Sequence, residues 1–162
     1  MKPVILDKDT FSAQVVRHQE AMFRAAKAIL RSDEDAEDAV QEAILAAFSA
    51  RASLREIEKF KPWILRILAN KCYDICRKRK NTVDLTEVED FLPAPERDPA
   101  ASMALWQAVM TLGGDIRAAV TLFYYDGFSI RDISQILGIS EPAVKTRLSR
   151  GRARLRQLLK EV

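Results

Sequence analysis

The stretch that decides the fold lies near the C-terminus, where residues 129–156 read SIRDISQILGISEPAVKTRLSRGRARLR. Ser129 can cap a short helix with regularly spaced isoleucines, and Gly138 then ends that helix. Ser140 can cap a second, longer helix that begins almost at once. Two helices joined by a short turn that contains a glycine predict a helix-turn-helix motif.

The second predicted helix of this motif separates its apolar residues from its polar ones. Val144, Leu148 and Leu155 share the face that would turn inward. The outward face carries hydroxyl and basic side chains, which are the groups that contact base edges and phosphates in the major groove. The residues expected to contact DNA are Lys145, Thr146, Arg147, Ser149, Arg150 and Arg152. The alternative is a solvated basic face on an ordinary helical hairpin.

The composition limits what the chain can be. Charged residues make up 30% and hydrophobic residues 48% of the 162 residues, which indicates a folded globular chain. No apolar run reaches the length of a membrane span and the N-terminus does not read as a signal peptide, so we expect a cytoplasmic protein without membrane insertion. Cys72 and Cys76 are poorly placed for a disulfide, and with His18 as the one histidine we expect no metal and no cofactor.

Charge is distributed in blocks along the chain. Residues 49–80 hold ten basic and three acidic side chains, and residues 129–162 hold eight and three. Between them, residues 81–101 hold six acidic side chains, one arginine and three prolines. Two basic blocks suggest two contacts with a polyanion, and the acidic, proline-containing stretch predicts a flexible linker. We therefore expect an all-α protein of two small helical domains, 1–80 and 102–162, joined by the linker 81–101, with the helix-turn-helix in the second domain.

Aromatic and basic residues alternate where the third predicted helix of the first domain begins. Aromatic rings can stack on unpaired bases while Lys and Arg side chains hold the backbone, so this face is a candidate for binding single-stranded DNA. The candidate residues are Phe60, Lys61, Trp63, Arg66, Asn70, Asp74, Arg77 and Lys78. The alternative is that Phe60 and Trp63 are core residues at the start of a helix.

A second candidate face is the acidic stretch 33–42, which reads DEDAEDAVQE. Three interpretations are open: a metal cluster, acidic residues that complement the positive end of a helix dipole, or a polar surface for a protein partner. Only part of the cluster can face one point and no histidine is near it in the sequence, which disfavours a metal.

Taken together, these stretches resemble the extracytoplasmic-function (ECF) group of bacterial sigma factors, over nearly the whole chain. Residues 35–42 look like region 2.2, residues 60–78 like regions 2.3 and 2.4, and residues 127–152 like region 4.2. The resemblance implies a promoter-specificity subunit of RNA polymerase that has no catalytic residue of its own. It also implies that the residues listed between Phe60 and Lys78 read the −10 promoter element, and those between Lys145 and Arg152 the −35 element.

The resemblance implies the partners as well. The core RNA polymerase would be bound at its β′ coiled coil and its β flap, and the β′ contact would be carried by Asp35, Asp38, Gln41 and Glu42. Promoter DNA and an anti-sigma factor are the other expected partners, and no small-molecule substrate is expected. The acidic linker would run toward the active-site and RNA-exit channel, either as a mimic of nucleic acid or as an inert tether.

Two other functions compete with this one. A free-standing helix-turn-helix regulator would explain residues 129–162, but not the second basic block or the pattern from Trp63 to Arg77. A metal nuclease built on the acids near Asp35 would be an enzyme of a different class. The sequence offers it no histidine cluster, no nucleophile with a positioned base and no glycine-rich phosphate loop.

Overall fold

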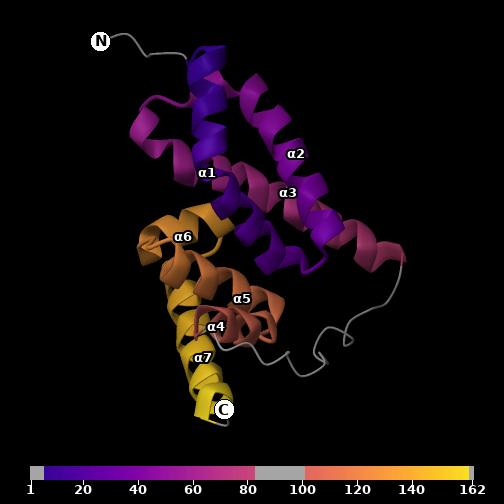
Figure 1. Ribbon diagram of the computed structural model, residues 1–162, viewed down its shortest axis with the longest axis vertical. Coiled ribbons are helices and arrows are strands. Elements are labelled where there is room, and N and C mark those ends of the chain that lie inside the picture. The colour runs from indigo at the N-terminus through magenta and orange to yellow at the C-terminus, as the bar shows by residue number, and fades with distance from the viewer. Residues whose placement is uncertain (1–5, 83–100, 161–162) are drawn as a thin grey trace.

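The computed structural model describes residues 6–82 and 101–160, and every regular element within these ranges is helical. Figure 1 shows two groups of helices stacked along the long axis of the molecule, which we call the N-terminal half (6–82) and the C-terminal half (101–160). The prediction of an all-α fold with two helical units is therefore confirmed. Residues 83–100, which make up most of the predicted linker 81–101, lie outside the described residues.

Three long helices and two short 3₁₀ turns form the N-terminal half. They are α1 (Lys8–Leu30), α2 (Asp33–Ser49), the turns Arg51–Ser53 and Ile57–Lys59, and α3 (Phe60–Thr82). Ser32 caps α2, because its hydroxyl accepts the N–H of Asp35 at 3.2 Å. The stretch 50–59, between α2 and α3, contains the two 3₁₀ turns.

The inner face of α2 is made of small side chains that are fully buried, namely Ala36, Ala39, Ala43 and Ala47. Their spacing follows the helical repeat, so they form one continuous stripe. A stripe of alanines lets neighbouring backbones approach closely, and α2 packs along both α1 and α3. The larger core residues come from those two helices and include Phe11, Met22, Phe60, Ile64, Leu65 and Leu68.

Four helices and a π-helical stretch form the C-terminal half. They are α4 (Ala101–Met110), α5 (Gly114–Val120), the π-helical stretch Thr121–Tyr125, α6 (Ile130–Leu137) and α7 (Glu141–Lys160). The hydroxyls of Ser129 and Ser140 accept backbone N–H groups at 3.1 and 3.2 Å at the starts of α6 and α7. Gly138 ends α6 in the left-handed conformation, with φ of 70°. The predicted helix-turn-helix is thus formed by α6, this turn and α7.

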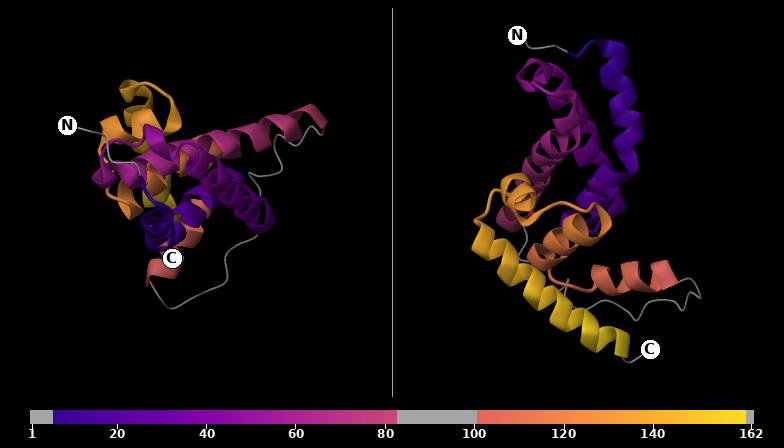
Figure 2. Two further views of the ribbon diagram at one scale, coloured as in Figure 1. Left: turned by 90° about the horizontal axis from the view of Figure 1, so that it is seen from above. Right: turned by 90° about the vertical axis from the view of Figure 1, so that its left-hand side faces the viewer.

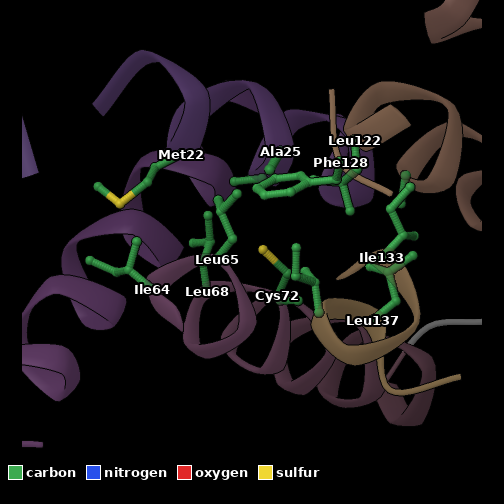
Figure 3. Close-up of a cluster of buried hydrophobic side chains, with 14 of the residues drawn as sticks. Met22, Ala25, Ile64, Leu65, Leu68, Cys72, Leu122, Phe128, Ile133 and Leu137 are labelled. Atoms are coloured by element: carbon green, nitrogen blue, oxygen red, sulfur yellow. The ribbon is translucent and has the colours of Figure 1, made fainter. Parts of the chain in front are cut away.

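The two halves pack against each other, an arrangement on which the sequence carried no prediction. α6 lies on α3, and α5 lies on α1. Figure 3 shows side chains from α1 and α3, such as Ala25 and Leu68, facing Leu122 and Leu137 of the C-terminal half. α7 runs along the far edge of the molecule from α2 (Figure 2, right). Among the described helices, none has the length and hydropathy needed to cross a bilayer.

Close packing of α7 on α5 depends on Gly151. A Cβ atom at this position would lie 2.5 Å from Cγ2 of Val120 and 3.1 Å from Cγ2 of Ile116. Both neighbours are β-branched and turn with difficulty, so the crossing has no room for a methyl group. A glycine inside a helix lowers the stability of that helix, but here it allows α7 to pack closely against α5.

Gly151→Ala should therefore destabilise the protein, because overpacking costs about 1–3 kcal/mol and exceeds the gain of about 1 kcal/mol in helix propensity. Urea unfolding followed by circular dichroism measures the difference. Gly113→Ala is the comparison variant, since a Cβ there meets no described atom within 4 Å. Because Gly113 is the N-cap of α5, where glycine is preferred to alanine, this variant should lose some stability, but less than Gly151→Ala. Equal unfolding midpoints for the two variants would contradict the close crossing.

Candidate nucleic-acid interface

The outward face of α7 carries the side chains predicted to contact DNA. Lys145, Thr146, Ser149, Arg150 and Arg152 are exposed, whereas the opposite face is buried through Val144, Leu148, Gly151 and Leu155. The helix is therefore held from one side only, and its polar side is open to a groove of duplex DNA. An α-helix presented in this way fits the width of the major groove.

Arg147 differs from its neighbours on α7. Its guanidinium is half-buried and lies 4.0 Å from the carboxylate of Asp115 on α5. The side chain thus sits at the flank of the recognition surface, where phosphates rather than base edges would pass. Arg152 lies on the other flank, and its guanidinium donates to the hydroxyl of Tyr124 at 3.4 Å.

The basic surface of α7 extends beyond Arg152, the last residue expected from the sequence to contact DNA. Arg150 and the exposed residues beyond it line an open groove along the second half of the helix, and these are Ala153, Arg154, Arg156, Gln157 and Lys160. Tyr124 on the π-helical stretch is also half-exposed beside this surface. The continued Arg spacing past Arg152 was the available signal for the extension, while nothing in the sequence marked Tyr124.

The second candidate face lies on α3. Arg66, Asn70, Arg77 and Lys78 are exposed, and Lys61, Trp63 and Asp74 are half-buried. The indole N–H of Trp63 donates to the hydroxyl of Ser53 at 3.2 Å, which fixes the ring at the start of the helix. The carboxylate of Asp74 forms an ion pair with Arg77 one turn later, so its visible role is to orient that cation.

Phe60 does not belong to this exposed face. Its side chain is 1% exposed and lies among Phe11, His18 and Trp63, with the His18 and Phe60 rings stacked at 5.8 Å between centroids. A buried ring cannot stack on a base, so the prediction that Phe60 contacts DNA is wrong for this conformation. For Phe60, the packing supports the alternative that its ring is a core residue at the start of a helix.

The acidic stretch on α2 divides into two parts. Asp38, Gln41 and Glu42 are exposed on one face, whereas Asp35 is mostly buried and pairs with Arg79 at the end of α3, at 2.6 Å. Leu45 follows one turn later on the same face and is 71% exposed. The sequence analysis missed Leu45, although it stands out of phase with the apolar stripe of its helix.

No group of three or more His, Cys, Asp or Glu side chains within 6–82 and 101–160 is placed to hold a metal ion. Cys72 and Cys76 form no disulfide. Cys72 is buried on the inner face of α3, and burial raises the pKa of its thiol to about 12, so the thiol stays protonated. Cys72 is part of the hydrophobic core.

Comparison with known proteins identifies the family of the chain. Residues 15–82 match the family model for Sigma-70 region 2, and residues 102–155 match the model for Sigma-70, region 4. The ECF RNA polymerase sigma factor SigM of Mycobacterium tuberculosis is 36% identical over 155 residues, which cover 94% of this chain and 79% of SigM. The chain belongs to the ECF sigma factors. A free-standing helix-turn-helix regulator would leave the match over residues 15–82 unexplained.

Other relatives agree with this assignment. The RNA polymerase sigma factor SigV of Bacillus subtilis is 30% identical over 149 residues, covering 91% of this sigma factor and 90% of SigV. Among solved structures, the sigma factor RpoE of Bartonella quintana, in complex with the anti-sigma factor NepR, has a TM-score of 0.76 at 30% identity. That likeness covers 95% of this chain and 98% of the RpoE chain.

His18 lies beneath the start of α3 in this sigma factor, stacked on Phe60. Burial lowers its pKa below the ordinary 6.5, and the cations of Lys61 and Arg17 lower it further, against a smaller opposing effect of the Asp126 carboxylate. The folded state therefore favours the neutral imidazole. As the pH falls below about 6.5, the unfolded chain takes up this proton more readily than the folded chain does, and stability decreases.

His18→Gln should remove this part of the pH dependence. His18 is the one histidine in the sequence, so no second imidazole contributes in the same range. Urea midpoints at about pH 7.5 and about pH 5.5 should move less in the variant than in the wild type, on either side of the unfolded value near 6.5. An equal loss of stability on acidification in both proteins would show that His18 is not desolvated.

Proposed function

We propose that this sigma factor binds core RNA polymerase through the exposed face of α2, reads the −10 element with α3 and reads the −35 element with α7. The observation that carries the proposal is the separation of faces on α2 and α7. Each helix is anchored by a buried stripe, while its opposite side presents exposed polar or basic side chains. The sigma factor is a specificity subunit acting in the cytoplasm, and the catalysis belongs to the polymerase.

The α2 face fits a protein partner. Asp38, Gln41 and Glu42 precede the exposed Leu45 on the same face of α2, so polar side chains lie next to an exposed apolar one. This composition is typical of an interface in which a desolvated centre supplies affinity and charges supply specificity. We assign it to the β′ coiled coil. Asp35 supports the face indirectly, because its ion pair with Arg79 joins α2 to the end of α3.

The α3 face fits the single-stranded part of an opened promoter. Trp63 is half-exposed at its start, and Arg66, Asn70, Arg77 and Lys78 follow along the helix. A partly exposed ring can take an unstacked base, and the cations can hold the phosphates on either side of it. Phe60 is left out of this assignment because it supports Trp63 from below.

An anti-sigma factor is the remaining proposed partner. Support comes from RpoE of Bartonella quintana, which was solved in complex with the anti-sigma factor NepR and shares the fold. The exposed polymerase-binding faces are the surfaces such a partner would cover. The β flap of the polymerase is proposed to bind the C-terminal half.

Asp38→Lys with Glu42→Lys should weaken binding to core polymerase at least about tenfold, since each reversal turns an attractive contact into a repulsive one. Exposed charges contribute little to the fold, so the unfolding midpoint should stay close to that of the wild type. Fluorescence anisotropy of labelled sigma factor with core polymerase gives the affinity.

The control for this variant is Asp9→Lys with Glu20→Lys, which makes the same change in net charge at exposed positions of α1. Its polymerase affinity should stay within about twofold of the wild type, because exposed charges far from the contact act only through screened solvent. Equal affinities for the two double variants would reject the α2 assignment.

Two arginines of α7 should differ in what they contact, Arg150 a base edge and Arg152 a phosphate. Arg150→Ala should cost about 1–3 kcal/mol at one base position and relax discrimination there, because Arg150 faces outward among the residues aimed at base edges. Arg152→Ala should weaken binding to all sequences alike and lower the salt slope by about one unit, because a phosphate contact carries no sequence information.

The measurement is transcription in vitro with core polymerase on promoters that carry every single-base change in the −35 element. Each variant is scored for its overall activity and for its base preference at each position. If Arg150→Ala lowers all promoters uniformly while Arg152→Ala changes base preference, the proposed register of α7 on DNA is wrong.

A further inference from the structure

We propose that the packing of the two halves is a closed, autoinhibited state of the free sigma factor, in which Asp126 of the C-terminal half latches the −10 face of α3. The inference rests on the proposed function of α3. The latch lies where the π-helical stretch of the C-terminal half ends beside α1 and the start of α3.

Asp126 forms an ion pair with Lys61, one of the cations that DNA would need. Its side chain is 0% exposed, and Oδ1 lies 2.9 Å from the guanidinium of Arg24 and 3.2 Å from the ammonium of Lys61. The same ammonium lies 5.3 Å from the ring centroid of Phe128. A carboxylate paired with a lysine in this way takes the position that a backbone phosphate would take.

A second cation of the α3 face is also engaged. The guanidinium of Arg66 donates to the backbone carbonyl of Gln135 near the end of α6. α6 therefore lies over the same side of α3 that the −10 strand would follow. Lys61 and Arg66 cannot hold phosphates while these contacts persist.

Two reciprocal arginine contacts reinforce the closed state at the end of α1. Arg31 of the N-terminal half donates to the carbonyl of Met110 at 3.1 Å. Arg117 of the C-terminal half donates to the carbonyls of Ala28 and Ile29 in return. Each half thus supplies a guanidinium to backbone carbonyls of the other.

The closed state leaves other surfaces available. The polymerase-binding face of α2 and the outward face of α7 are both exposed in it. Elements named −10 and −35 stand about 25 base pairs apart, or about 85 Å at about 3.4 Å per base pair. A compact chain of this length has a radius of gyration of about 15 Å, so the closed molecule cannot read both elements at once. Polymerase can therefore dock first, and the latch must open before the promoter is read.

Small-angle X-ray scattering of the full chain tests the latch without DNA or polymerase. Asp126→Asn should raise the radius of gyration by at least about 3 Å over the wild type, because the two halves separate and the compact scaling no longer applies. Arg24→Gln removes the guanidinium of α1 that pairs with Asp126, and it should raise the radius of gyration in the same way. Asp9→Asn makes the same charge change as Asp126→Asn at an exposed carboxylate of α1 and should leave the wild-type value.

Binding of a fluorescein-labelled 20-nucleotide oligo(dT) provides the second readout. Asp126→Asn should bind it at least about fivefold more tightly than Asp9→Asn, since affinity rises with the fraction of open molecules. Arg24→Gln should also bind more tightly than the wild type, although it removes a positive charge.

Compact scattering and unchanged DNA affinity in both Asp126→Asn and Arg24→Gln would overturn the latch. An expanded wild type would overturn it as well. The proposed function is tested separately by transcription with core polymerase. Absence of transcription from all of these proteins would overturn the proposed function, whereas a compact Asp126→Asn protein that transcribes normally would overturn the latch alone.

Discussion

A buried guanidinium, that of Arg117, fixes how the helices of this sigma factor meet. The side chain is 2% exposed and donates to the carbonyls of Ala28, Ile29 and Leu112. The first two carbonyls belong to the last turn of α1, where no intrahelical donor remains and the helix dipole is negative. A buried cation is tolerated only when its donors are used, so the end of α1 and the corner between α4 and α5 must stay together for as long as Arg117 is buried.

Within the part of the chain that the structure describes, the interface between the two halves leaves some of its buried polar groups without a hydrogen-bond partner, and this favours separation of the halves. Oδ2 of Asp126 and the hydroxyl of Tyr125 are buried without a hydrogen-bond partner among the described residues. Each such group costs the closed state free energy that water would return on opening. The apolar contacts of Leu65 and Leu68 with Leu137 oppose that gain. Closed and open states can therefore lie within a few kcal/mol, which is the range in which a partner can shift the population.

The local features of this fold could be read from the sequence, and the contacts between halves could not. Ser32, Ser129 and Gly138 act on neighbours a few residues away, so their helix starts and stops were predictable. The pair of Arg24 and Asp126 joins positions 102 residues apart through one oxygen and leaves no periodic trace. For the same reason the sequence left Phe60 undecided between core and DNA, since a ring at a helix start has the same pattern in either place.

On α7 the fold and the recognition surface use different residues of one helix. Val144, Leu148 and Gly151 hold it to the C-terminal half, and Lys145 and Arg150 take no part in that packing. Substitutions at exposed helical positions usually change stability by less than about 0.5 kcal/mol. The outward face, which we propose reads the −35 element, can therefore change without cost to the scaffold. The buried face cannot change so freely, because a methyl group at Gly151 already meets Val120. Promoter choice can thus diverge between sigma factors that keep the same fold.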